Sequence, residues 1–397
     1  MSTSLKVRLW AGREKPVALG HPWIFSGAIE GWNREPVAGE TVDVHAADGS
    51  WLARGFTNPE KNLAIRLYTW KEEQPLDTAF FAGRIDAALG LRERLFTGPE
   101  TDSYRLVFSE ADGVSGLIVD RYADALAVHV GALGLVPLLE PMLEHLAKKT
   151  GIARRVVSAD REAVDREGID PAAMARYSTE RGIAVRIREN HFQYDVDIGG
   201  GQKTGFYLDQ RVNRQRVAAY VAGRSVLSAY CYTGAFEIHA AAAGAREIAG
   251  LDSSESALAA ARRHHALNQL TVPVDYACAD VPEALRRYRD AGRQFDVIIL
   301  DPPRFVMNAG QKEKGMRAYK DINLLGIKLL TPGGFLATFS CSGLVSLEDL
   351  KMTVRWAAKD AGRVVCFLET LGQPPDHPVS VTFPEGEYLT GTVCYVE

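Results

Sequence analysis

Acidic side chains stand at or just after the ends of successive strand-like segments in the second half of the chain. These are Asp252 after residues 247–251, Asp280 after residues 274–277 and Asp301 after residues 296–300. In open sheets of parallel strands, ligands bind outside the carboxyl ends of the strands. Each acid could instead be the N-cap of the helix that follows, since Asp is a favoured cap. Three in succession nevertheless indicate one shared ligand site.

The turn after the first of these strands has too few glycines for a phosphate-binding loop. Residues Tyr230-Cys231-Tyr232-Thr233-Gly234 follow the strand-like stretch 225–229 and contain one glycine, whereas a nicotinamide site uses G-x-G-x-x-G. A ligand without phosphate groups is therefore favoured. S-adenosylmethionine fits, because its sulfonium is cationic and its ribose hydroxyls and adenine amine donate hydrogen bonds that carboxylates accept.

A thiol stands at the end of the last predicted parallel strand. Residues 334–339 are followed by Ser340-Cys341-Ser342, and in the expected strand order 3-2-1-4-5 the fourth and fifth strands are neighbours, so Cys341 and Asp301 should face one pocket. A lone cysteine is most often a small buried hydrophobe, and Cys231 in the expected cofactor turn is a rival thiol. The position of Cys341 opposite a carboxylate favours a nucleophile.

The composition excludes several classes of protein. The chain has 397 residues, enough for two or three domains, and its net charge of -4 excludes a global basic field for nucleic acid. The five cysteines are widely separated and form no C-x-x-C pair, which argues against a disulfide framework and a metal site. The chain starts without a signal-peptide pattern, and no apolar stretch reaches membrane-spanning length, so we expect a cytoplasmic protein with no membrane attachment.

Hydrophobic patterning divides the chain into three predicted domains, 1–74, 75–184 and 185–397. In the first, a small β-barrel-like module is predicted by strand-like residues at 7–9, 41–44, 51–56 and 64–68 between turn signals. In the second, an α+β domain is predicted by helices at 77–96 and 135–149 and strands at 106–109, 116–120 and 125–130.

The third predicted domain alternates strands and helices, which is typical of a doubly wound α/β sheet. Its strands are expected at 225–229, 247–251, 274–277, 296–300 and 334–339. A helix is expected at 255–268, with Ser253 or Ser254 as its N-cap. Residues 379–383 and 388–396 are expected to form a closing antiparallel hairpin, which would distinguish this fold from a plain dinucleotide-binding domain.

Two stretches could contact RNA. Trp23 stands beside Phe25 and follows a basic start of the chain, and aromatic rings next to cations suit stacking on RNA bases. A packed barrel core explains the same rings. The segment after Asp301 is rich in cations, namely Arg304, Lys312, Lys314, Arg317 and Lys320. These could bind phosphates over the mouth of the site or form a solvated helix face.

Six motifs together resemble those of a known family. They are 21–27 (HPWIFSG), 203–211 (KTGFYLDQR), 232–234 (YTG), 301–305 (DPPRF), 319–323 (YKDIN) and 339–343 (FSCSG). Over essentially its whole length the chain resembles the bacterial 23S rRNA cytosine-C5 methyltransferases, which join a PUA domain, a small central domain and a class I S-adenosylmethionine-dependent domain. The chain departs from the family at Ser115, Ala235 and Arg304, where Pro, Gly and Lys are frequent.

The resemblance implies an N-terminal PUA domain, a Rossmann-like methyltransferase domain, S-adenosylmethionine as the cofactor, and 23S rRNA or a large-subunit precursor as the partner. It implies that Cys341 is the nucleophile. Our mechanistic hypothesis is that the Cys341 thiolate adds to carbon 6 of the target cytosine and that Asp301 hydrogen-bonds the ring. The implied cofactor residues are Tyr207, Asp209, Arg211, Tyr232, Thr233, Gly234, Asp252, Ser253 and Asp280.

Other functions stay open on the sequence. A uracil-C5 methyltransferase also pairs Asp-Pro-Pro-Arg with a strand-end cysteine, and Asp-Pro-Pro-aromatic motifs also position exocyclic amines for methylation. An RNA-binding assembly factor without activity is an alternative of another class. The sequence does not identify the methylated nucleotide, and it leaves the oligomeric state open, with a homodimer as one expectation.

Overall fold

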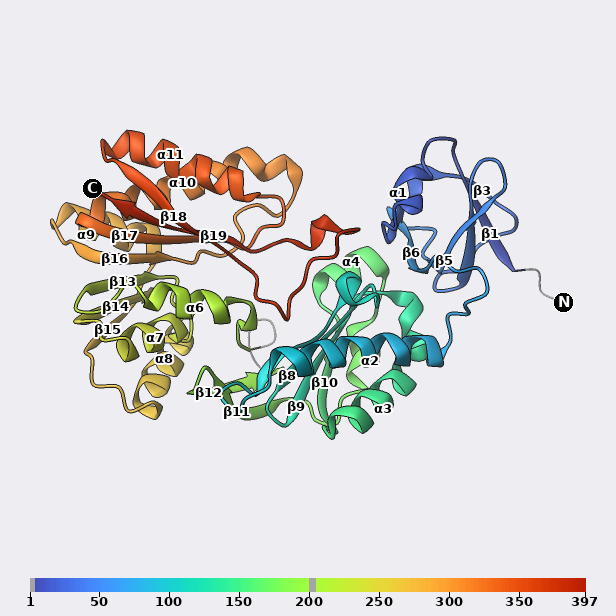
Figure 1. Cartoon of the computed structure of the whole chain (residues 1–397), viewed down its shortest axis with the longest axis horizontal. Helices are drawn as coiled ribbons and strands as arrows, with labels where there is room; N and C mark the ends of the chain where they lie inside the picture. The colour runs from blue at the N-terminus through green and yellow to red at the C-terminus, as the bar shows by residue number, and fades with distance from the viewer. Residues whose placement is uncertain (1–3, 200–204) are drawn as a thin grey trace. The chain divides into compact units, whose positions relative to one another are not determined.

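The computed structural model describes residues 4–199 and 205–397 (Figure 1). These residues form two compact units. The first unit draws on Met1–Arg188, Val196–Gly205 and Pro375–Gly386, and the second on Glu189–Asp195, Phe206–Pro374 and Glu387–Glu397. Each unit contains its own hydrophobic core.

A six-stranded sheet occupies the N-terminal part of the first unit. In the order β2-β6-β5-β4-β1-β3 it contains β1 (Leu5–Leu9), β2 (Trp23–Phe25), β3 (Ile29–Trp32), β4 (Thr41–His45), β5 (Trp51–Thr57) and β6 (Leu63–Thr69), with the short helix α1 (Lys15–Ala18) between β1 and β2. Leu5, Val7 and Leu9 are buried in β1 while the residues between them are exposed, because successive side chains of a strand point to opposite faces. The sequence predicts four of these strands but misses β2 and β3, which have only three and four residues.

The rest of the first unit is built on a four-stranded sheet. Its order is β10-β9-β8-β7, formed by β7 (Ser103–Phe108), β8 (Leu117–Tyr122), β9 (Ala125–Val130) and β10 (Arg154–Ser158), and its helices are α2 (Thr78–Leu95), α3 (Leu139–Thr150), α4 (Arg161–Glu167) and α5 (Pro171–Ala175). The predicted start of α3 at residue 135 is wrong. Residues Leu133–Leu138 form a 3-10 helix that contains Pro137, and a proline cannot donate the backbone hydrogen bond of an α-helix.

A two-stranded sheet of β11 (Ile183–Glu189) and β12 (Phe192–Ile198) precedes the second large sheet along the chain. That sheet has seven strands in the order β15-β14-β13-β16-β17-β19-β18. They are β13 (Ser225–Ala229), β14 (Glu247–Asp252), β15 (Val274–Cys278), β16 (Phe295–Leu300), β17 (Leu330–Ser340), β18 (Val365–Gly372) and β19 (Thr390–Val396). The first five pair in parallel, so the expected 3-2-1-4-5 order of a doubly wound sheet is confirmed.

Helices cover both faces of this sheet (Figure 1). The helices of the second unit are α6 (Arg211–Ala218), α7 (Ala235–Ala242), α8 (Glu255–Leu267), α9 (Val281–Asp290), α10 (Lys312–Leu329) and α11 (Leu347–Ala361). One core contains Leu285 of α9, Ile322 of α10 and Leu350 of α11. Another contains Val217 of α6 and Phe236 of α7. The sheet is therefore buried on both sides, as parallel sheets usually are.

The predicted closing hairpin has the wrong first strand. β19 pairs antiparallel with β18, which begins at Val365, and not with residues 379–383. Val381 is 99% exposed, and that segment holds only an isolated bridge between Ser380 and Phe383. Prolines at 378 and 384 flank the segment and cannot donate to a sheet, whereas β18 is an edge strand whose mostly exposed side chains give no alternating signal.

A carboxylic acid is fully buried in the second unit. Glu237 lies in the first turn of α7, just after the turn that ends β13, and it is 0% exposed. Burial raises the pKa of Glu237 to about 7. The carboxyl is therefore largely protonated below neutral pH, and its ionisation above that pH costs stability.

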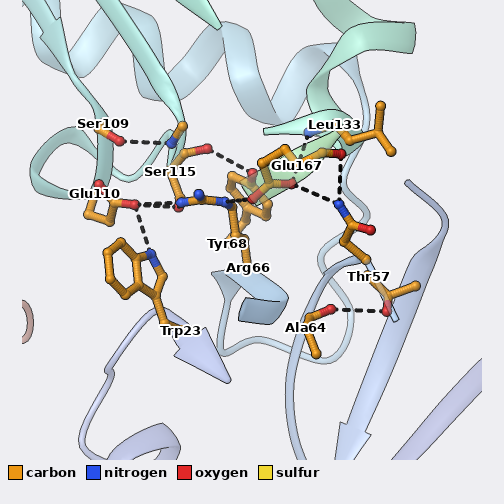
Figure 2. Close-up of polar contacts among 12 residues, drawn as sticks. Trp23, Thr57, Ala64, Arg66, Tyr68, Ser109, Glu110, Ser115, Leu133 and Glu167 are labelled. Atoms are coloured by element: carbon orange, nitrogen blue, oxygen red, sulfur yellow. Dashed lines mark hydrogen bonds and ion pairs between the residues drawn. The ribbon is translucent and has the colours of Figure 1, made fainter. Parts of the chain in front are cut away.

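An arginine and two carboxylates join the six-stranded sheet to the four-stranded part of the same unit (Figure 2). Arg66 on β6 contacts Glu110 at 3.0 Å and Glu167 at 2.8 Å, and all three side chains are nearly buried. The Arg66 guanidinium lies over the Trp23 ring, and Trp23 Nε1 donates a hydrogen bond to Glu110 at 2.8 Å (Figure 2). Buried charges are costly unless paired, so this cluster ties the two parts of the unit together.

We expect Glu237→Gln to stabilise the protein at pH 8 but to have a small effect at pH 5. Because the folded-state pKa of Glu237 is raised to about 7, the wild-type protein loses stability as the pH rises from about 4.5 through 7, by about 3 kcal/mol. Glutamine does not ionise, so the variant keeps that stability. Urea unfolding at both pH values measures the difference, with exposed Glu60→Gln as the control. An equal difference at pH 5 and pH 8 would contradict the assignment.

We expect Arg66→Met to destabilise the first unit by about 3–5 kcal/mol, because Glu110 and Glu167 would stay buried without their cation. Denaturant unfolding measures the change. Arg8→Met is the matched control, since Arg8 forms an exposed ion pair with Glu30 that should contribute less than about 1 kcal/mol. Equal effects of the two substitutions would show that the Arg66 cluster does not hold the unit together.

Candidate active site

The turn that follows β13 is strained and is tied to the neighbouring strand. Tyr230, Tyr232 and Gly234 have φ angles of +65°, +48° and +83°. The Tyr232 backbone N–H donates to Asp252 Oδ2 at 2.9 Å, and a Cβ on Gly234 would lie 2.8 Å from that of Ala261, so only glycine fits there. Non-glycine residues at positive φ cost free energy and tend to gather at functional sites.

The predicted ribose-binding carboxylate is held firmly by backbone donors. Asp252 accepts from Tyr232 through Oδ2 and from the Ser254 N–H through Oδ1, each at 2.9 Å, and the residue is partly exposed. Each carboxylate oxygen can accept a further hydrogen bond, so the oriented group can still bind hydroxyls. Ser254 caps α8 by accepting from Ala257, while Ser253 is exposed beside it.

Asp280 is the N-cap of α9. Its Oδ1 accepts from the Glu283 N–H at 3.0 Å, at the start of α9, and the residue is exposed. This is the N-cap alternative that the sequence left open.

The segment before α6 carries a buried oxygen that lacks a donor. Asp209 Oδ2 accepts from the Tyr388 hydroxyl at 2.7 Å, while Asp209 Oδ1 is buried and has no hydrogen-bond partner among the described residues. A buried carboxylate oxygen without a donor is costly. A cofactor with a cationic or donor group fits this position, and S-adenosylmethionine carries both an ammonium and a sulfonium. The residues present are therefore compatible with that cofactor.

Other residues of motif 203–211 lie close by. Burial raises the pKa of the Tyr207 hydroxyl, and the nearby Tyr232, Asp301 and Cys341 groups raise it further. The Tyr207 ring also meets the Tyr232 ring edge to face at 5.2 Å. Arg211 is buried at the start of α6, and Lys203 and Thr204 lie outside the described residues.

The predicted nucleophile and carboxylate lie at the ends of neighbouring parallel strands. Asp301 follows β16 and Cys341 follows β17, in a register where Leu300 pairs with Thr338. The Cys341 sulfur lies 3.8 Å from the carbonyl oxygen of Pro302, the residue after Asp301, and Cys341 is partly exposed. In contrast, the rival Cys231 is buried, which raises the pKa of its thiol. Of these two thiols, Cys341 is therefore the accessible one.

A buried tyrosine supports the strand end that carries Cys341. Ser340 Oγ donates to the Tyr319 hydroxyl at 2.9 Å, the Ser342 hydroxyl lies 3.5 Å from it, and Tyr319 is 0% exposed in α10. The Val306 N–H in turn donates to Ser342 Oγ at 3.4 Å. These bonds fix the backbone on both sides of Cys341 and link it to the loop after Asp301.

An amide that the sequence analysis did not single out contacts the predicted catalytic carboxylate. Gln210 Nε2 donates to Asp301 Oδ1 at 2.9 Å, and Asn213 Nδ2 donates to Gln210 Oε1 at 2.6 Å. Gln210 belongs to motif 203–211, so the motif indicated that this segment lies near the site but not which group Gln210 contacts. Its partner is 91 residues away, and no local pattern indicates that contact.

The cations predicted to bind RNA differ in their surroundings. Lys312 pairs with Asp349 at 2.7 Å, Lys320 pairs with Asp360 at 2.5 Å, and Arg317 pairs with Glu313. Arg304 and Lys314 are exposed and form no ion pair with the residues that the structure describes. In the first unit, Trp23 is partly buried in the Arg66 cluster (Figure 2). Arg304 and Lys314 are thus the cations most available to a phosphate.

Within residues 4–199 and 205–397, no group of three or more His, Cys, Asp or Glu side chains could hold a metal ion. No helix in the same ranges has the length and hydropathy needed to cross a membrane.

Comparison with known proteins identifies relatives over the whole chain. A family model described as S-adenosylmethionine-dependent methyltransferase matches residues 138–384, and one described as PUA-like domain matches residues 7–70. The ribosomal RNA large subunit methyltransferase I of Shewanella denitrificans is 42% identical over 395 residues, covering 99% of this chain and 100% of the relative. The protein of the same name from Cronobacter sakazakii is 39% identical over 397 residues, with 99% and 100% covered.

Solved structures share the fold. A Streptococcus mutans protein described as a SAM-dependent methyltransferase has a TM-score of 0.82 at 19% identity, covering 98% of this chain and 99% of that chain. A second methyltransferase structure, complexed with SAH, has a TM-score of 0.84 at 20% identity with the same coverage. From the matched family model and the full-length relatives, the chain belongs to the S-adenosylmethionine-dependent methyltransferase family, together with ribosomal RNA large subunit methyltransferase I, and its cofactor is S-adenosylmethionine.

Proposed function

We propose that this protein methylates carbon 5 of a cytosine in large-subunit ribosomal RNA through a covalent adduct with Cys341. The observation that carries the proposal is the pairing of β16 with β17, which brings a partly exposed thiol and the Asp301 segment to one edge of the sheet. The relatives named for ribosomal RNA support the class of substrate, and the PUA-like match supports an RNA contact in the first unit.

Carbon 5 of a pyrimidine is a poor nucleophile, and addition of a thiolate to the neighbouring carbon 6 would make carbon 5 more nucleophilic. The Cys341 sulfur forms a bond to carbon 6, which moves the ring electrons toward carbon 5. Bound S-adenosylmethionine would supply an electrophilic methyl group, and carbon 5 would take that methyl group while the bond between the methyl group and the sulfonium breaks and leaves a neutral thioether. A base then takes the carbon 5 proton, the bond between sulfur and carbon 6 breaks, and the thiolate is regenerated.

Asp301 has the charge and place to orient the ring. As an ionised carboxylate it only accepts hydrogen bonds, and the 4-amino group of cytosine is a donor. The distance of 3.8 Å between the Cys341 sulfur and the Pro302 carbonyl places the thiol against the same loop. Because the base must leave its stack to reach this edge, unstacking would cost a few kcal/mol.

We expect wild-type protein to produce 5-methylcytidine in unmodified ribosomal RNA and Cys341→Ala to lower turnover by about three orders of magnitude or more. Nucleoside mass analysis measures the product, and calorimetry should give unchanged S-adenosylmethionine binding by the variant. Cys366→Ala is the matched control, since Cys366 is an exposed cysteine on β18. Normal turnover by Cys341→Ala would exclude the covalent route, and 5-methyluridine as the product would support the uracil alternative.

We expect the double variant Arg304→Ala, Lys314→Ala to bind RNA less tightly, and we expect its RNA affinity to depend less steeply on salt concentration. Both side chains are exposed, and removing one phosphate-binding cation should reduce the slope of log affinity against log salt by about 0.7 to 0.9. Fluorescence anisotropy with a ribosomal RNA fragment measures the slope. Lys320→Ala is the control, because Lys320 is paired with Asp360. An unchanged slope in the double variant would remove these cations from the RNA surface.

A further inference from the structure

We propose that Gln210 is a positioning residue that keeps the Asp301 carboxylate oriented as a hydrogen-bond acceptor. The hydrogen-bonded series Asn213–Gln210–Asp301, called the relay below, would select a target base that donates a hydrogen bond to Asp301. The inference rests on the proposed function and deepens it, because it names the group that sets the choice between cytosine and uracil. It concerns Gln210, Asn213 and Asp301, three side chains of the second unit.

The three side chains form a chain of donors and acceptors in one direction. Asn213 Nδ2 donates to Gln210 Oε1 at 2.6 Å, and Gln210 Nε2 donates to Asp301 Oδ1 at 2.9 Å. Gln210 is 3% exposed and Asn213 is 1% exposed. Water therefore has little access to the relay, and its two hydrogen bonds must come from the protein itself.

The direction of the relay follows from its chemistry. If the Gln210 amide were turned over, its oxygen would face the Asp301 carboxylate and its NH2 would face the Asn213 NH2, which leaves two acceptors and two donors in contact. Buried polar groups without partners cost about 1–3 kcal/mol each, so the observed orientation is strongly favoured. A hydrogen bond donated to a carboxylate favours its ionised form. Gln210 thus keeps Asp301 as an acceptor.

The backbone of the Gln210 segment is anchored as well. Arg214 Nη2 donates to the Tyr207 carbonyl oxygen at 2.5 Å, and Arg214 Nη1 contacts Glu189 at 2.5 Å. The Arg214 and Glu189 side chains are 3% and 0% exposed. The buried Arg214, paired with Glu189, therefore fixes the backbone that leads into Gln210. Moving the Gln210 amide away from Asp301 would disturb these Arg214 contacts.

An acceptor at Asp301 discriminates between the two pyrimidines. Cytosine presents an amino donor at position 4, whereas uracil presents a carbonyl oxygen there. An ionised carboxylate facing that oxygen would place two acceptors together, which is unfavourable. The relay therefore favours cytosine, and loss of the Gln210 donor should weaken this preference, because the Asp301 carboxylate would no longer be held toward the edge of the base.

Full-length Gln210→Met and Gln210→Glu test the relay. Both keep the length of the side chain, but methionine cannot donate and glutamate adds a negative charge beside Asp301. We expect kcat to fall roughly tenfold to a hundredfold, with unchanged affinity for S-adenosylmethionine by calorimetry. The acidic limb of the pH–rate profile should move to higher pH, most strongly for Gln210→Glu. Gln193→Met, an exposed glutamine in the same unit, is the matched control.

Base choice is measured with two ribosomal RNA transcripts that carry cytidine or uridine at the methylated position. We expect the ratio of kcat/KM for cytidine over uridine to fall at least about tenfold in Gln210→Met. An unchanged pH profile and an unchanged ratio in both variants would overturn the relay while the wild type still methylates cytidine. Wild-type protein that methylates no cytidine would instead overturn the proposed function, so the two failures are distinguishable.

Discussion

The parallel pairing of β16 with β17 is the constraint on which the site depends. Leu300 stands opposite Thr338 in this register, so the residues that follow the strands, Asp301 and Cys341, leave the sheet at one edge. A shift of one residue would move Cys341 by about 3.3 Å and turn it to the other face. The ends of β13 and β14 reach the same edge, where the Tyr232 N–H and Asp252 are hydrogen-bonded.

Backbone strain and buried polar groups without partners, which normally destabilise a protein, gather at this edge of the sheet. Tyr230 and Tyr232 adopt positive φ, and Asp209 Oδ1 is buried without a donor among the described residues. Glu237, in the helix that follows the turn, is buried and its pKa is raised to about 7. Strain and unsatisfied polar groups are expected where a ligand completes the structure. The buried hydrogen bonds of Tyr319 and Gln210 hold the Cys341 strand end and the Asp301 side chain in place.

Much of this arrangement could be predicted from the sequence, because short apolar strands followed by Asp or Cys mark the ends of a parallel sheet. The strand order was predictable because alternating strands and helices indicate a doubly wound sheet, and the proximity of Asp301 and Cys341 follows from that order. What the sequence could not indicate are contacts between distant residues, such as those of Gln210 with Asp301 and of Tyr388 with Asp209. The exposed edge strand β18 was missed since its side chains do not alternate, and the roles assigned to the site residues stay predictions.

RNA containing 5-fluorocytidine should trap a covalent adduct between Cys341 and the target base. Fluorine at carbon 5 cannot leave as a proton, so the adduct should accumulate after methyl transfer. We expect a protein–RNA complex that survives denaturing electrophoresis, depends on S-adenosylmethionine and maps by mass spectrometry to Cys341. A complex that maps to Cys231, or methyl transfer to normal RNA with no complex on the fluorinated RNA, would contradict it.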